Sequence, residues 1–123
     1  MPATNGAAMK RKGSAFERQV VTVLREHGHP GASRSYGAGR PKDVGDVAGL
    51  PGFCIEAKCH RSIDLAGWLD EATREAANAG PGVVPVVVAK RRGRPAESAY
   101  AVLSLADLAD LIARRPTEMG AVT

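Results

Sequence analysis

The chain has 123 residues, enough for one domain built around a single hydrophobic core. Its formal net charge of +4 and isoelectric point of about 9.4 make it modestly basic, which suits a polyanionic partner without requiring one. No apolar run is long enough to span a bilayer, so we expect no membrane partner. The N-terminus lacks the apolar stretch of a signal peptide, and two cysteines without one favour reduced thiols in the cytoplasm.

We expect three parts along the chain: a flexible basic tail over 1–12, a folded domain over 13–115 and a frayed end over 116–123. The first helix is predicted to begin at Ser14, because Ser14 and Glu17 form a capping-box pattern. Gly28 should end this helix, since Pro30 prevents it from resuming.

Alternating strand and helix patterns follow. In order they are a short strand within 32–40 that leads into a glycine loop, a hairpin of 44–49 and 53–58, a helix from Asp64 to Gly80, a buried strand over 83–89, a strand over 99–103 and a last helix capped by Ser104. This order predicts an α/β sandwich, with a mixed central β-sheet and helices packed on its faces.

The hairpin gathers the charged side chains of most interest. Successive strand residues point to opposite faces, so Glu56 and Lys58 lie side by side on one face of an apolar strand. Direct pairing across the Pro51-Gly52 turn would point Asp46 away from Glu56. One extra residue, as a bulge at Gly49, would set Asp46 opposite Glu56. A functional site therefore requires irregular pairing near Gly49.

Two interpretations of this cluster stay open on the residues alone. An ion pair of Glu56 with Lys58 is the ordinary meaning of such a spacing. If Asp46 and Glu56 converge, however, they need a proton or a cation between them, and Mg²⁺ (or Mn²⁺) is a natural occupant of an oxygen site. Glu17, at the edge of the helix stripe, could reach such a metal through a water, although a capping-box glutamate needs no further purpose.

Basic residues recur in clusters that could converge on one face and follow a phosphate backbone, although scattered solvated charge is the alternative. The candidate DNA-binding residues are Arg34, Ser35, Arg40, Lys42, Arg61, Lys90, Arg91 and Arg92.

Three short motifs resemble those of the PD-(D/E)xK nucleases, and more narrowly the archaeal-type Holliday junction resolvases and their phage-encoded relatives. These motifs are Gly13–Arg18, Gly45–Val47 and Ile55–Lys58. The resemblance implies a restriction-endonuclease-like sandwich, a homodimer, and Mg²⁺-dependent nicking of four-way DNA junctions.

Carried over by position, the resemblance makes Glu17 the acid of the first helix, Asp46 and Glu56 the metal ligands, and Lys58 the catalytic lysine. Arg34 and Ser35 fall in the region that the family uses near the scissile phosphate.

The match has one departure. The family usually has proline directly before the first aspartate, whereas Gly45 precedes Asp46 and the nearby proline is Pro41, so Asp43 is an alternative ligand. The function alternatives are another nuclease of the superfamily that acts on duplex or flap DNA, and a non-catalytic DNA-binding module of the same fold.

Overall fold

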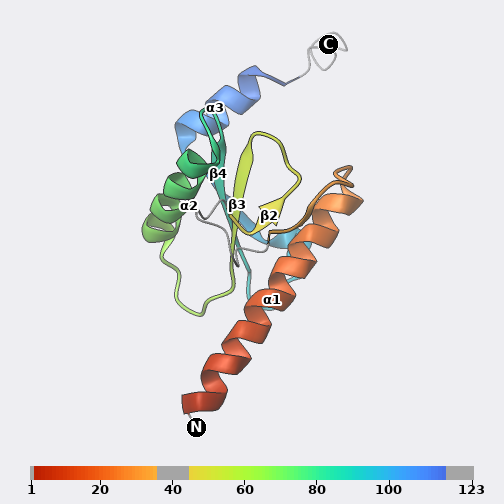
Figure 1. Ribbon diagram of the computed structural model, residues 1–123, viewed down its shortest axis with the longest axis vertical. Coiled ribbons are helices and arrows are strands. Elements are labelled where there is room, and N and C mark those ends of the chain that lie inside the picture. Colours follow the sequence, from red (N-terminus) through yellow and green to blue (C-terminus); the bar gives the residue numbers. More distant parts are fainter. Residues whose placement is uncertain (1, 36–44, 116–123) are drawn as a thin grey trace.

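The structure is a computed structural model that describes residues 2–35 and 45–115. In this part of the chain it is an α/β fold with a five-stranded, mixed, open sheet and three α-helices (Figure 1). The elements are α1 (Pro2–Glu26), β1 (Ser33–Arg34), β2 (Val47–Ala48), β3 (Phe53–Lys58), α2 (Leu65–Ala79), β4 (Val84–Ala89), the short 3₁₀ helix η1 (Ala96–Ser98), β5 (Tyr100–Val102) and α3 (Leu105–Ala113).

The strands lie in the order β1-β2-β3-β4-β5. β3 and β4 are parallel, while the other neighbours pair antiparallel. A parallel pair needs a crossover connection, and α2 supplies it between β3 and β4. The predicted mixed sheet is therefore confirmed.

α1 and α2 cover opposite faces of the sheet. Phe16 and Val20 of α1 pack in one core cluster with Ile55 of β3. Trp68 and Ala72 of α2 pack in a second cluster with Val87 of β4. Because side chains alternate along β3, the residues between those of the α1 face, including Glu56, point towards α2. The sheet thus places the charged residues of β3 under α2.

α1 begins at Pro2, so the predicted start at Ser14 was wrong. Proline suits the first turn of a helix, where its missing N–H leaves no hydrogen bond unmade, and the alanine-rich segment that follows favours a helix. Ser14 therefore lies inside the helix and does not cap it. The predicted end is confirmed, because Gly28 follows the helix with φ +97°. Figure 1 shows the N-terminal turns extending well past the sheet.

The hairpin has the irregular pairing that the site requires. Val47 pairs with Ile55, which is one residue out of step with direct pairing across the turn. The regular register ends there, because the Asp46 amide also donates to the Ile55 carbonyl, at 2.7 Å. Gly49 supplies the extra residue, with φ +83°. A Cβ at Gly49 would collide with the carbonyl of Gly31, so no other residue fits this backbone without movement.

α3 follows the predicted Ser104 cap, whose hydroxyl accepts a hydrogen bond from the Asp107 amide at 3.1 Å. None of its residues is buried against the described part of the chain. No helix among the described residues has the combined length and apolar character needed to cross a bilayer. The predicted glycine loop at 37–39 and frayed end at 116–123 lie outside the described residues.

Candidate functional site

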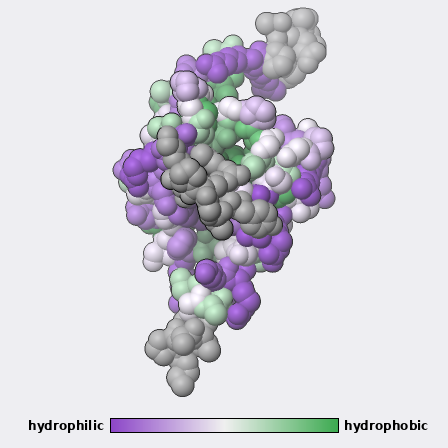
Figure 2. Space-filling model, in the orientation of Figure 1, coloured by the Kyte–Doolittle hydropathy of each residue, from purple (hydrophilic) through white to green (hydrophobic). Residues whose placement is uncertain are grey.

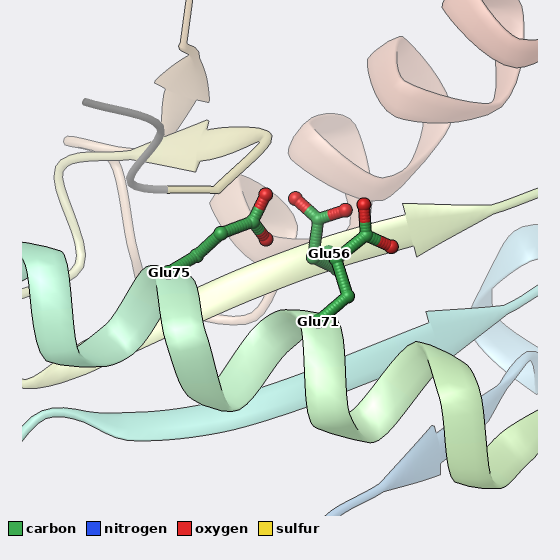
Figure 3. Close-up of side chains that lie close together, drawn as sticks. All are labelled: Glu56, Glu71 and Glu75. Carbon is green, nitrogen blue, oxygen red and sulfur yellow. The ribbon is translucent and has the colours of Figure 1, made fainter. Parts of the chain in front are cut away.

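Three glutamates meet between β3 and α2. Glu56 projects from the middle of β3 and is only 4% exposed. One carboxylate oxygen each of Glu56, Glu71 and Glu75 lie within 4.8 Å of one another (Figure 3). Glu71 and Glu75 are four residues apart, so they occupy the same face of α2 and reach the strand together. The result is a compact acidic cluster at the helix–sheet boundary.

Lys58 provides a positive charge inside this cluster. Its Nζ donates a hydrogen bond to Glu71 Oε1 at 2.7 Å and lies 3.6 Å from Glu56 Oε2. The lysine therefore contacts both helix and strand, and its closer partner is Glu71. The predicted side-by-side placement of Glu56 and Lys58 is confirmed.

Burial raises the pKa of Glu56 from 4.5 to about 7, because a charged carboxylate loses its hydration there. The negative charges of Asp46 and Glu71 raise this pKa further. The contact with the Glu75 carboxyl and the charge of Lys58 act in the opposite direction, and do not overcome burial. Glu56 is thus poised to gain or lose a proton near neutral pH.

Lys58 is held in its charged form. Burial alone would lower its pKa, but the hydrogen bond to Glu71 and the charges of Glu71, Glu56 and Asp46 outweigh burial and raise the pKa above its ordinary value. A permanently charged ammonium beside a titrating carboxyl is suited to stabilising negative charge on a bound group.

Asp46 is held by three hydrogen bonds, two to β3 and one to Ser35, which follows β1. Its Oδ2 accepts from the Ala57 amide at 2.8 Å, its own amide donates to the Ile55 carbonyl at 2.7 Å, and its carbonyl accepts from the Ser35 amide at 2.8 Å. Its negative charge is one of the causes that raise the pKa of Glu56. Asp46 nevertheless lies outside the group of three glutamates.

The backbone conformation before Asp46 explains why this position holds glycine. Gly45 has φ +102°, whereas proline is restricted to about −65°. A Cβ at Gly45 would also lie 2.9 Å from Cys54 Sγ. The backbone that presents Asp46 here therefore excludes the proline that the resembling family usually carries. The alternative ligand, Asp43, lies outside the described residues.

Glu17 lies elsewhere. Its Oε1 accepts hydrogen bonds from Arg34 at 2.9 and 3.2 Å, so it forms an ion pair with β1. α1 packs on the sheet face opposite to Glu56, and the acidic cluster found among the described residues does not include Glu17.

The basic candidates separate into two settings. Arg61, Lys90 and Arg92 line one hollow in the surface. Arg91 instead lies over the ring of Tyr100, 5.1 Å from its centroid. The remaining basic candidates, Arg40 and Lys42, fall in the segment that is not described.

Sequence reasoning missed Glu71 and Glu75, although one signal was present. Trp68, Ala72, Glu75 and Ala76 are the buried residues of α2, at the i, i+4, i+7 and i+8 spacing of a core-facing stripe. Glu75 therefore occupies a position that normally takes an apolar side chain. A glutamate in such a stripe indicates a buried polar partner on the facing element.

The carboxylates of Glu56, Glu71 and Glu75 form a donor set that fits a hard cation. Oε1 of Glu56 is buried and receives no hydrogen bond from an N–H or O–H group of the described residues. Facing carboxyl groups need a shared proton or a cation, and carboxylate oxygens are the ligands that Mg²⁺ prefers.

Fold and site together define an α/β protein with a buried carboxylate cluster, a charged lysine and an adjoining basic hollow. Searches of protein-family models, of characterised proteins and of solved structures found no match to this chain.

Proposed function

We propose that this protein is a Mg²⁺-dependent DNA endonuclease with a restriction-endonuclease-like fold, and that it nicks four-way junctions. The observation that carries the proposal is the irregular hairpin, which bonds Asp46 to Ile55 and Ala57, the residues on either side of Glu56, while Lys58 lies 3.6 Å from Glu56. The order of motifs along the chain, which resembles that of junction resolvases, supports the choice of substrate.

Asp46 and Glu56 would hold the Mg²⁺, for which Mn²⁺ is a reasonable substitute. When bound, the metal supplies a more acidic water and neutralises charge on the phosphate. Lys58 faces the same space, and its role is to stabilise negative charge on the reacting phosphate group. Glu71 holds the Lys58 ammonium in place through their 2.7 Å contact.

Glu17 takes part in this proposal mainly through its ion pair with Arg34. The pair would orient the guanidinium beside Ser35, whose amide bonds to the Asp46 carbonyl. This chain of contacts connects α1 with the metal-ligand strand. A ligand role for Glu17 itself would require the ion pair to open.

The substrate is inferred from charge. Cations from several segments gather near the site, and a phosphate backbone is the polyanion that such an arrangement recognises best. We place this activity in the cytoplasm, where the thiols of Cys54 and Cys59 would stay reduced.

Paired nicks across a junction require two active sites, which a twofold dimer supplies. α3 carries an apolar face that the described chain leaves uncovered: Leu105 is 80% exposed and Ile112 64%, with Leu108 between them. Figure 2 shows apolar surface near this end of the molecule on an otherwise largely hydrophilic face. We propose that a second copy covers it.

The charges along α3 favour an antiparallel arrangement of the two copies. Asp107 and Asp110 lie in the helix, and Arg114 and Arg115 follow its end. Antiparallel packing would place the acidic half of each helix beside the basic end of the other. A twofold axis perpendicular to the two helices produces this pairing.

One observation favours a second candidate function, a non-catalytic DNA-binding module. Lys58 lies closer to Glu71 than to Glu56, as a structural ion pair would. A single assay separates the candidates: labelled four-way junction, linear duplex and flap DNA, each incubated with Mg²⁺ or with EDTA.

Symmetric nicks confined to the junction support the proposal. Equal cutting of linear duplex or flap DNA would show that the protein is a nuclease, but one that does not prefer four-way junctions. Binding without any cutting in Mg²⁺ or Mn²⁺ would establish the non-catalytic module.

A further inference from the structure

A basic hollow lies beside the acidic cluster. It has a volume of about 340 Å³ and is lined by Lys12, Cys59, His60, Arg61, Lys90, Arg92 and Gly93. Four of these residues carry a fixed positive charge, and no acidic residue of the described chain lines the hollow. The cations come from three separate segments: α1, the loop after β3 and the loop after β4. Their convergence is a product of the fold, because nothing in the local sequence brings them together.

The hollow adjoins the site through the backbone. Cys59 directly follows Lys58, and the Lys90 amide donates a hydrogen bond to the Lys58 carbonyl at 2.9 Å. Its walls therefore begin where the parallel strands β3 and β4 end. The crevice beyond the carboxyl ends of parallel strands is where open α/β sheets commonly bind ligands.

The early turns of α1 form one wall. Lys12 belongs to the segment in which sequence patterns predicted an unstructured tail, and the helix fixes its position instead. A neighbouring hollow of about 410 Å³ shares Lys12, Cys59, His60 and Arg61 and continues towards Met9. The second hollow thus continues the first along α1, where Ala8 and Met9 join the shared residues.

We propose that this hollow seats a backbone phosphate of the DNA strand on one side of the cleavage site, with Lys12, Arg61, Lys90 and Arg92 as its cationic contacts. The identity of the ligand as DNA rests on the proposed function, whereas the affinity for phosphate rests on the hollow itself. Lys12, which the sequence placed in a flexible basic tail, becomes a DNA contact held in position by α1. The continuation along α1 gives the strand a path beyond the first hollow.

Binding measured without metal separates this inference from catalysis. A fluorescein-labelled four-way junction is titrated in EDTA with wild-type protein, Lys12→Ala and Arg92→Ala, at several salt concentrations. Arg74→Ala is the matched control, because Arg74 is an exposed cation on α2 that does not line the hollow. Circular dichroism verifies that each variant is folded.

We expect Lys12→Ala and Arg92→Ala each to weaken binding by roughly fivefold or more at about 0.1 M salt, and to reduce the salt slope by about one. Arg74→Ala should change affinity less than about twofold. Titration of the wild type with inorganic phosphate should shift the amide resonances of Cys59, Arg61 and Gly93, and Lys12→Ala should suppress these shifts.

Wild-type affinity and salt slope in both hollow variants would overturn the inference, as would phosphate shifts located elsewhere. Failure of the proposed function gives a different pattern: Lys12-dependent binding persists, but no cleavage follows when Mg²⁺ is added. A third result is also distinguishable: the protein cleaves the junction, but Lys12→Ala binds it as tightly as the wild type. That result would support the nuclease proposal and refute a role for the hollow in binding DNA.

Discussion

Replacing Glu56 with glutamine should make the protein more stable at pH 8 and leave its stability at pH 5 little changed. The folded state raises the pKa of Glu56 from 4.5 to about 7, so folding favours the protonated form. Stability from this group is fully present below pH 4.5 and is lost as the pH rises through 7. The difference between 4.5 and about 7 corresponds to roughly 3 kcal/mol. Glu56→Gln keeps the shape of the neutral acid and cannot ionise.

Urea unfolding of both proteins between pH 5 and pH 8 measures this effect. The free energy of unfolding of Glu56→Gln should exceed that of the wild type by up to about 3 kcal/mol at pH 8, and the gap should close below pH 5. The other groups facing Glu56 are Asp46, Lys58, Glu71 and Glu75, and they are common to both proteins. A difference that does not vary with pH would refute the reasoning. Millimolar Mg²⁺ should narrow the gap at pH 8 by stabilising only the wild type.

Three further predictions concern activity, backbone and assembly. Asp46→Asn and Lys58→Ala should each reduce cleavage by at least about a hundredfold in a gel assay while junction binding in EDTA persists, and loss of binding in both would refute their catalytic assignment. Gly49→Ala should lower the free energy of unfolding by more than about 2 kcal/mol, because its Cβ meets the Gly31 carbonyl, and an unchanged urea midpoint would contradict the bulge geometry. Leu108→Glu should shift the mass in analytical ultracentrifugation from dimer to monomer, whereas Ala106→Glu, on the other side of α3, should not; a wild-type monomer would exclude α3 as a dimer interface.

The hairpin was predictable from sequence because its determinants are local. Pro51-Gly52 specified the turn, alternation specified the faces, and the need for a bulge at Gly49 followed from counting residues across the turn. The same local reasoning failed at Ser14, where a capping-box pattern lies within a longer helix. A cap pattern states where a helix could begin, and the preceding residues decide whether it does.

Contacts between distant segments were beyond such reasoning. The partner of Glu17 is on β1, and the two glutamates that meet Glu56 are on α2. No periodicity in the sequence pairs these residues. The expectation that Glu17 and Glu56 share a site assumed that both lie on one face of the sheet. In the packed structure, Glu17 lies on α1, which covers one face of the sheet, whereas Glu56 points towards α2 on the other face.

The acidic cluster also bears on the choice between a structural ion pair and a metal site. Burying carboxyls beside one another costs stability, and well-packed apolar residues at Glu56 and Glu75 would avoid that cost. Lys58 offsets part of the negative charge, yet the pKa of Glu56 stays near neutrality, so the pair with the lysine does not compensate for burial. An arrangement retained at the expense of stability is typical of a functional site. A divalent cation held by Asp46 and Glu56 would supply the missing positive charge, and that is why we favour the metal site over an ion pair that serves the fold alone.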